Sequence, residues 1–262
     1  MNRIDELFRR KSKRVLNVYC TAGYPEVSST PEVLKALQES GADMIEIGMP
    51  YSDPLADGPV IQGSSSKAIA NGMTLQKLFS DLKGFRNQIN LPVILMGYMN
   101  PVLQYGFEKF CADCAEVGVD GLIIPDLPMY EFETEYGPLI REHGLRFVFL
   151  VTPESSDDRV KKLDDLSSGF LYAVSSSSTT GNEKNIDKQL NYFQRLQNMK
   201  LKNPVLIGFG IKNRETFDTA CAYANGAIIG TAYIKALENV NGEKDSITRT
   251  TKEFINGIIG GQ

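Results

Sequence analysis

The sequence contains one histidine, four cysteines and no long apolar run. The histidine, His143, lies late in a predicted helix, just before Gly144, which excludes histidine-based catalytic triads and histidine-rich metal sites. No apolar stretch approaches the roughly 20 residues that span a bilayer, and residues 1–14 lack the apolar core of a secretory signal. The sequence therefore predicts a cytoplasmic protein with no membrane partner.

The cysteines do not form a recognisable metal site. Cys111 and Cys114 make a C-x-x-C pattern, but no second pair is present to complete a zinc site. Both lie on the apolar face of a predicted helix, together with Phe107 and Phe110. We interpret them as core residues and predict no metal and no cofactor in this chain.

An excess of positive charge is also lacking. The formal net charge is -4 at pH 7, which argues against a nucleic-acid partner bound by bulk electrostatics but leaves local anion sites open. No G-x-x-x-x-G-K-[ST] motif is present, and Gly208-Phe209-Gly210 is not a dinucleotide fingerprint. Acid–base chemistry must therefore come from carboxylates, tyrosines or lysines.

What the sequence does contain is a regular alternation of short apolar runs with helical patterns. Strands buried on both faces and separated by helices are typical of a parallel sheet. Eight such units in 262 residues match the size of an α/β fold of the (β/α)8 TIM barrel type. A doubly wound sheet is the alternative, because periodicity cannot show closure. The predicted strands cover residues 15–20, 44–47, 92–96, 120–124, 145–151, 170–174, 205–208 and 227–229.

Two helices are predicted outside this repeat. One is an extra N-terminal helix over residues 4–8, and the other is a short helix over residues 232–237, after the eighth strand. Ser155 with Asp158 is predicted to form a capping box at the start of a helix. No stretch has the composition of a linker, so we expect a single (β/α)8 barrel domain over residues 1–262.

A carboxylate interrupts the second predicted strand. Glu46 follows Met44 and Ile45 in an apolar run, and an unpaired buried carboxylate costs several kcal/mol or gives up its charge. Glu46 is therefore either paired with a structural cation or held at the mouth of a pocket. The proline-rich loop after it carries Asp53 and Asp57 and suits a positioned functional loop.

In (β/α)8 barrels the site lies at the C-terminal ends of the strands, and phosphate groups often bind after strands seven and eight. Here Gly208, Gly210 and Gly230 follow those strands and would let backbone N–H groups approach an anion, beside the short helix at 232–237. The alternative is that these glycines only make tight turns. The polar segment 175–181, SSSSTTG, is expected to be an active-site lid rather than a linker.

The sixth predicted strand also bears on mechanism. Residues 170–178 contain no lysine, so a Schiff-base aldolase is not expected. Carbon–carbon cleavage at this site would have to use general acid–base catalysis.

With these residues placed, the chain resembles the α subunit of tryptophan synthase over essentially its whole length. The core of the resemblance is the stretch from Glu46 to Gln62, EIGMPYSDPLADGPVIQ. The resemblance implies a (β/α)8 barrel that acts as a lyase and cleaves indole-3-glycerol phosphate to indole and glyceraldehyde 3-phosphate. It further implies a β subunit partner in an α2β2 complex, which receives the indole and uses pyridoxal phosphate to make tryptophan. Supporting motifs lie at residues 21–25, 99–101, 125–128, 208–210 and 230–231.

The resemblance also assigns roles to individual residues. Glu46 falls on the catalytic glutamate of the family, which shuttles protons to indole C3 and from the C3′ hydroxyl. Asp57 falls on the catalytic aspartate, which stabilises charge on the indole nitrogen. The substrate-binding positions it implies are Tyr19, Tyr98, Tyr172 and Phe209 around the indole and its support, and Thr180, Gly181, Gly210, Gly230 and Thr231 at the lid and the phosphate.

One segment departs from the family pattern. Loop six in the family often reads Ser-Arg-x-Gly-Val-Thr-Gly, and here Ser176 stands at the arginine position while Thr180 and Gly181 match. The departure leaves the catalytic carboxylates unchanged and falls in the segment that bears on lid closure and on communication with the β subunit. Two other readings remain open at this stage: an isomerase of the same fold acting on a phosphorylated aminosugar, and a non-catalytic subunit that activates a partner. Intact carboxylates at 46 and 57 argue against the last.

Overall fold

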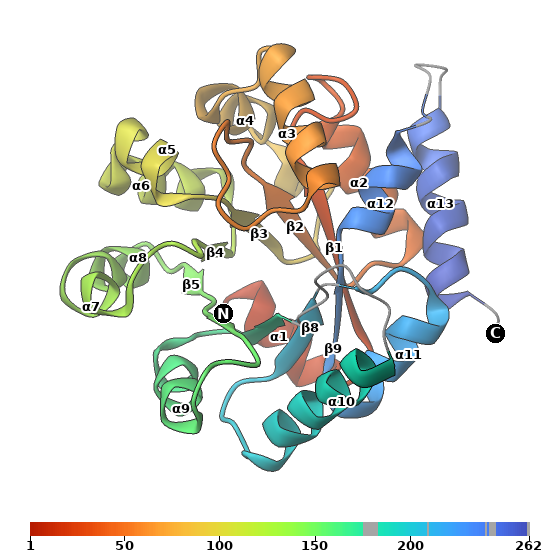
Figure 1. The fold of residues 1–262 in the computed structure, drawn as a ribbon. Coiled ribbons are helices and arrows are strands. Elements are labelled where there is room, and N and C mark those ends of the chain that lie inside the picture. Colours follow the sequence, from red (N-terminus) through yellow and green to blue (C-terminus); the bar gives the residue numbers. More distant parts are fainter. Residues whose placement is uncertain (175–182, 209, 239, 241–244, 261–262) are drawn as a thin grey trace.

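The computed structural model describes residues 1–174, 183–208, 210–238, 240 and 245–260. Within these residues nine strands form one parallel sheet at the centre of the molecule (Figure 1). The eight predicted strands are all present, with boundaries that differ by at most one residue at either end, and the fifth is divided in two. The strands are β1 Val15–Thr21, β2 Met44–Gly48, β3 Val93–Met96, β4 Gly121–Ile123, β5 Arg146–Phe147, β6 Leu150–Val151, β7 Leu171–Val174, β8 Val205–Gly208 and β9 Gly226–Ile229.

The segment 146–151 closes the sheet into a barrel. The strand order is β5-β4-β3-β2-β1-β9-β8-β7-β6, so the two outer strands are consecutive in the chain. The backbone N–H of Val148 still donates to Leu122 O at 3.0 Å, whereas Phe149 O accepts from Tyr172 N at 3.0 Å. One segment therefore leaves the hydrogen bonds of β4 and joins those of β7. The order never reverses along the sheet, which excludes the doubly wound alternative.

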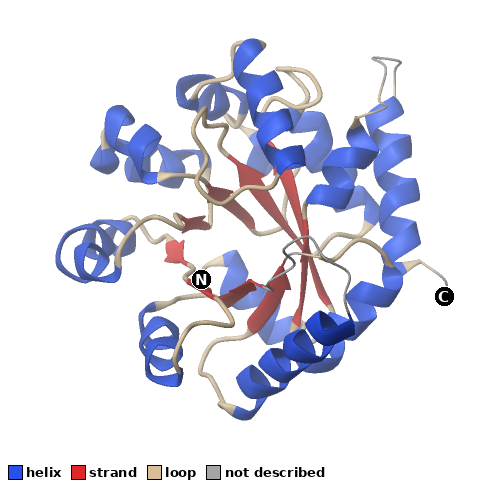
Figure 2. Ribbon diagram, viewed as in Figure 1, coloured by secondary structure: helices blue, strands red, loops and turns tan. Residues whose placement is uncertain are grey.

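Helices surround the strands, as Figure 2 shows with the strands in red at the centre and the helices in blue outside. A short 3-10 helix at Phe85–Asn87 and a π-helix at Phe132–Tyr136 are also present. None of the helices in the described part of the chain is long and apolar enough to cross a bilayer. The helices are α1 Arg3–Arg10, α2 Thr30–Ser40, α3 Pro59–Ala70, α4 Leu75–Asp81, α5 Met99–Tyr105, α6 Phe107–Val117, α7 Met129–Glu131, α8 Gly137–Glu142, α9 Asp157–Leu166, α10 Glu183–Asn198, α11 Arg214–Tyr223, α12 Thr231–Leu237 and α13 Ser246–Ile259.

The two predicted additions to the repeat are both present. Helix α1 packs Ile4 and Leu7 against the side chains that fill the barrel, and Arg3 forms a 3.0 Å ion pair with the buried Asp120. Helix α12 follows β9 directly, one residue earlier than predicted. These contacts explain why α1 stays on the barrel although it lies outside the βα repeat.

The predicted capping box at Ser155 is wrong by one residue. Ser156 caps α9, because its side chain accepts a hydrogen bond from Arg159 N at 3.3 Å. The Ser155 hydroxyl instead accepts from Thr152 N at 3.1 Å, within the loop before the helix. Adjacent serines give the same sequence signal, and the loop hydrogen bond decides which of them caps.

Side chains alternate between the inside and the outside of the barrel along each strand. Leu16 and Val18 face the helices, while Val15 faces the interior. Packed side chains fill the interior, which is typical of a (β/α)8 barrel and makes it a core rather than a channel. The interior cluster comprises Ile4, Leu7, Val15, Met44, Ile94, Ile123, Val148, Phe170, Tyr172, Leu206 and Ile228.

Candidate active site

Glu46 is buried in the centre of the sheet. It lies on β2, its residue is 1% exposed, and its Oε2 accepts a hydrogen bond from Asn17 Nδ2 at 3.0 Å. Burial raises the pKa of Glu46 to about 8, the hydrogen bond from Asn17 opposes the rise, and the charge of Asp57 adds to it. Among the described residues the groups that act on the pKa of Glu46 are Asn17 and Asp57, and no cationic side chain is one of them, which does not support the structural-cation alternative. A carboxyl group with a pKa near 8 holds a proton at neutral pH and can act as a general acid.

Asp57 lies in the loop between β2 and α3 and is partly exposed. Burial raises the pKa of its carboxyl group above the ordinary value, and a hydrogen bond with the Tyr98 side chain opposes that rise. The Tyr98 hydroxyl also accepts from Ala56 N at 3.1 Å. One tyrosine from the end of β3 thus anchors both the backbone and the carboxylate of this loop.

Tyr19 and Tyr172 lie close to both carboxylates. Each is buried, and after burial itself the charges of Glu46 and Asp57 are among the causes that raise the pKa of each hydroxyl. The structure therefore brings together Glu46 from β2, Asp57 from the following loop, Tyr19 from β1 and Tyr172 from β7. Two of these strands, β2 and β7, are far apart in the sheet order, and closure of the barrel lets their residues face one another.

Two glycines make room for these tyrosines. A Cβ on Gly48 would lie 1.9 Å from the Tyr19 hydroxyl oxygen, and a Cβ on Gly208 would lie 2.2 Å from the Tyr172 hydroxyl oxygen. The sequence prediction for Gly208 was close approach of an anion to the backbone. The structure gives a different reason for this glycine, since the neighbouring ring occupies the space of a side chain.

The predicted phosphate region lies where β8 and β9 end. Gly210 has a positive φ of 76°, which favours glycine, and Gly230 is the N-cap of α12, whose first residue is Thr231. Gly230 also packs on Tyr19, because a Cβ there would lie 3.3 Å from the Tyr19 Cβ. The predicted residues Thr180, Gly181 and Phe209 lie outside the described residues.

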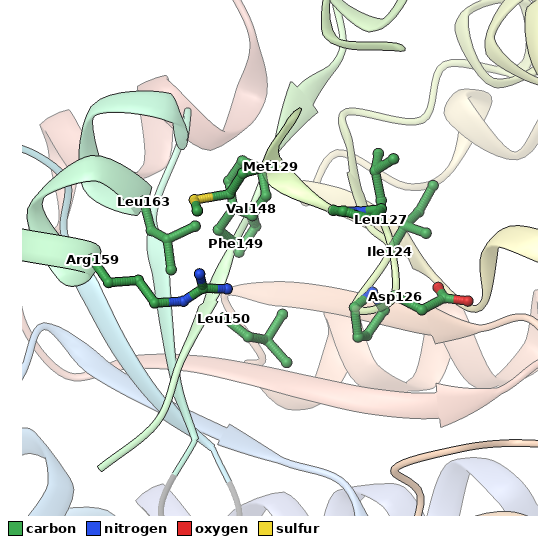
Figure 3. Close-up of a pocket in the computed structure, with 11 residues that line it drawn as sticks. Ile124, Asp126, Leu127, Met129, Val148, Phe149, Leu150, Arg159 and Leu163 are labelled. Carbon is green, nitrogen blue, oxygen red and sulfur yellow. The ribbon is translucent and has the colours of Figure 1, made fainter. Parts of the chain in front are cut away.

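A cavity of about 260 Å³ opens at the same rim, beside Asp126 (Figure 3). Asp126 accepts from Met99 N at 2.9 Å and contributes to the raised pKa of Tyr98, so the cavity adjoins the tyrosine that anchors Asp57. Asp126 belongs to the supporting motif at residues 125–128, but sequence reasoning missed the cavity, which forms between separate loops. It is lined by Ile124, Pro125, Asp126, Leu127, Pro128, Met129, Val148, Phe149, Leu150, Arg159 and Leu163.

Sequence reasoning also missed Asn17, a residue of the site. It is fully buried on β1, and its Oδ1 has no hydrogen-bond partner among the described residues. Leaving a buried acceptor unpaired costs about 1–3 kcal/mol. The available signal was the amide itself, which interrupts the apolar run from Val15 to Cys20 as Glu46 interrupts the next strand.

Comparison with known proteins decides the family. A sequence model described as tryptophan synthase alpha chain matches residues 6–258. The chain belongs to the tryptophan synthase alpha chain family. It is 52% identical over 243 residues to the tryptophan synthase alpha chain of Christiangramia forsetii, covering 92% of this chain and 94% of the relative. As a member of this family the chain is an enzyme subunit of tryptophan biosynthesis.

Solved structures of the family share the fold. The tryptophan synthase alpha subunit of Legionella pneumophila superposes with a TM-score of 0.88 at 32% identity, covering 98% of this chain and 97% of that one. A chain of the tryptophan synthase complex from Pyrococcus furiosus gives a TM-score of 0.84 at 34% identity, covering 96% and 100%. The predicted barrel architecture and the family resemblance are both confirmed.

Proposed function

We propose that this chain is a carbon–carbon lyase that cleaves indole-3-glycerol phosphate to indole and glyceraldehyde 3-phosphate by a retro-aldol reaction. The observation that carries the proposal is the pair of carboxyl groups in one site. Glu46 is buried and has a pKa of about 8, and Asp57, which interacts with it, is partly exposed. Two carboxyl groups in different environments suit two different tasks in one reaction.

The first step uses Glu46 as an acid. Its protonated carboxyl group delivers a proton to C3 of the indole ring, and positive charge develops on the ring nitrogen. The Asp57 carboxylate stabilises that charge and accepts the N–H proton. Tyr98 holds Asp57 and its loop in position through the contacts described above.

The second step uses Glu46 as a base. Its carboxylate takes the proton of the C3′ hydroxyl, a carbonyl forms at C3′, and the bond between indole C3 and C3′ breaks with its electron pair returning to the ring. Asp57 returns its proton to the ring nitrogen as the electron pair reaches the ring, which completes the N–H of indole. Indole and the aldehyde then leave, with Glu46 protonated and Asp57 ionised for the next turnover. Tyr19, Tyr172 and Phe209 are the residues proposed to bind the indole ring.

The phosphate of the substrate binds where β8 and β9 end, across β1 from the strand that carries Glu46. The proposed ligands are backbone N–H groups at Gly181, Gly210, Gly230 and Thr231, with Thr180 closing over Asp57. Thr231 begins α12, so the helix dipole favours an anion there. A local site of this kind needs no net positive charge on the protein.

The proposed partner is a β subunit that receives the indole and converts it with its own pyridoxal phosphate. Three large apolar side chains are exposed in the segments that follow three consecutive strands: Leu55 in the loop after β2, Leu103 in α5 after β3 and Tyr130 in α7 after β4. Exposed apolar groups gathered on one rim are typical of a docking surface. The similarity to a chain of the Pyrococcus furiosus complex supports a partner, and we propose an α2β2 assembly in the cytoplasm with residues 1–262 as one domain.

The test is indole release from indole-3-glycerol phosphate by the purified chain, with and without a β subunit from a close relative. Wild type is compared with Glu46→Gln and Asp57→Asn, and circular dichroism checks that each variant folds. We expect release by the wild type, stimulated by the β subunit and lost in both variants. No release by the wild type even with the partner would overturn the proposal and favour the isomerase reading.

A further inference from the structure

Asn17 is a buried amide in the interior of the barrel. It faces the interior between Val15 and Tyr19 on β1, and none of its surface is exposed. Its inward neighbours include Val15 and Met44, which belong to the apolar interior cluster. A valine or leucine would pack there without burying a polar group. The fold alone therefore gives no reason for an amide at this position.

The amide is attached to Glu46 at one end only. In the ladder between β1 and β2, Asn17 lies opposite Met44. Met44 is two residues before Glu46 on β2, so its side chain lies on the same face of the strand. The Nδ2 of Asn17 donates a hydrogen bond to Glu46 Oε2 at 3.0 Å. Its Oδ1 is buried and has no hydrogen-bond partner among the described residues. The Nδ2 donor of Asn17 is therefore hydrogen-bonded to the Glu46 carboxyl group, whereas the Oδ1 acceptor of the same side chain is unpaired.

Glu46 needs both kinds of partner during the proposed reaction. Its carboxylate form can only accept hydrogen bonds, whereas its protonated form carries an O–H that must donate. A primary amide is the side-chain group that offers N–H and C=O side by side. We infer that Asn17 is a positioning residue that holds the Glu46 carboxyl group in place both before and after each proton transfer. This inference rests on the proposed function.

The two states use different atoms of the amide. Nδ2–H donates to the carboxylate, and Oδ1 accepts the O–H of the carboxylic acid after a rotation of either group about its terminal single bond. No proton passes to Asn17, so the proton balance of the proposed reaction is unchanged. Asn17 acts through Glu46 and needs no contact with substrate.

The effect on Glu46 has a definite sign. The bond from Nδ2 stabilises the charged form and so lowers the pKa of Glu46 against the effect of burial. Removing the amide removes a charge-assisted bond from the carboxylate and a weaker neutral bond from the acid, so the pKa rises. The other titratable groups that interact with Glu46 are Tyr19, Cys20, Asp57 and Tyr172, and all of them remain in the variant.

The first measurement is the pH profile of indole release by Asn17→Leu, assayed with the β subunit. We expect kcat to fall about ten-fold and the alkaline limb to move up by about one pH unit, because the carboxyl group loses both partners. KM is expected to change by less than about two-fold, since the substrate loses no contact. Val18→Ala is the matched control, because Val18 is buried on the same strand but faces the helices. It should keep the alkaline limb of the wild type.

The second measurement does not depend on turnover. The infrared C=O band of the protonated Glu46 is identified by its loss in Glu46→Gln and is titrated in the wild type and in Asn17→Leu. A higher midpoint in Asn17→Leu supports the inference. Should leucine prevent folding, Asn17→Val is titrated in its place.

The two measurements separate the inference from the function it rests on. In one outcome the wild type releases indole, but Asn17→Leu shows neither a shifted infrared midpoint for Glu46 nor a shifted pH profile. That result would overturn the role of Asn17 and leave the lyase proposal standing. A shifted midpoint in a protein that releases no indole would leave the pairing of Asn17 with Glu46 standing and overturn the lyase proposal.

Discussion

The ring of Tyr19 occupies the space that a side chain on Gly48 would need. A Cβ on Gly48 would meet the Tyr19 hydroxyl oxygen at 1.9 Å and the ring carbon that bears it at 2.4 Å. Gly48 ends the strand that carries Glu46, and Tyr19 pairs with Glu46 across the ladder. The glycine therefore lets an aromatic ring lie across the end of β2, directly above the buried carboxyl group.

The first prediction tests this close approach. Gly48→Ala forces the Tyr19 ring to move, and a buried ring has little freedom to do so, so we expect indole release to fall about ten-fold or more. Gly63→Ala is the control, because a Cβ at Gly63 meets no atom within 4 Å and alanine favours helix α3 by about 0.5–1 kcal/mol. Equal activities in the two variants would show that the position of Tyr19 does not matter for the reaction.

The second prediction concerns stability and pH. The pKa of Glu46 is raised from 4.5 to about 8, so the folded protein holds a proton that the unfolded chain has lost between these pH values. The contribution of Glu46 protonation to the free energy of unfolding therefore falls as pH rises from 4.5 to about 8. One pKa unit corresponds to about 1.4 kcal/mol, so the loss amounts to at most about 5 kcal/mol. Glu46→Gln carries no such charge and is expected to be more stable than the wild type at pH 8.

Urea unfolding at a series of pH values measures this difference. The gap in the free energy of unfolding between Glu46→Gln and the wild type should widen from pH 5 to pH 8. Glu116→Gln, at an exposed position on α6, provides the control and should follow the wild type at every pH. A constant gap for Glu46→Gln would mean that the Glu46 carboxyl group titrates normally in the folded protein.

The third prediction concerns the acid side of the pH profile. The Tyr98 hydroxyl lowers the pKa of Asp57, so Tyr98→Phe is expected to raise that pKa. Because Asp57 must be ionised to stabilise the indole nitrogen, activity should begin to fall at a higher pH when the solution is acidified. The pH dependence of kcat/KM measures this limb.

A neighbouring tyrosine supplies the control for this experiment. The Tyr51 hydroxyl accepts from Asn100 Nδ2 at 3.0 Å, and its ring lies 5.6 Å from that of Tyr98. Tyr51→Phe removes a hydroxyl from the same cluster of rings without removing the partner of Asp57. An equal shift of the acid limb in both variants would show that the effect does not depend on the hydrogen bond between Tyr98 and Asp57.

These residues also show what the sequence could predict. The strands are predictable because each is a short apolar run bounded by loop residues. Glu46 and Asp57 are predictable as site residues because a carboxylate is costly to bury in an apolar strand, and because a proline-rich loop holds its side chains in fixed positions. Closure was not predictable, because it depends on one segment exchanging its hydrogen-bond partners from β4 to β7. The partnership of Asn17 with Glu46 also depends on strand register, which pattern alone does not give.

The fourth prediction concerns the proposed partner surface. Leu55 is 80% exposed in the loop that also carries Asp57, so a charge there disturbs a docked β subunit without entering the site. Leu55→Lys should leave indole release by the isolated chain within about two-fold of the wild type, because no contact to the carboxylates is lost. It should reduce stimulation by the β subunit about ten-fold or more, since a buried unpaired charge is costly at an interface.

Ile69→Lys separates docking from the general effect of adding a charge. Ile69 is also an exposed apolar residue, but it lies near the end of α3, away from the loop that carries Leu55. Titration of each variant with the β subunit, followed through indole release, gives the concentration for half-maximal stimulation. We expect that concentration to rise for Leu55→Lys and to stay at the wild-type value for Ile69→Lys. If both variants bind the β subunit as the wild type does, the partner docks elsewhere, and the exposed residues at the C-terminal rim have another role.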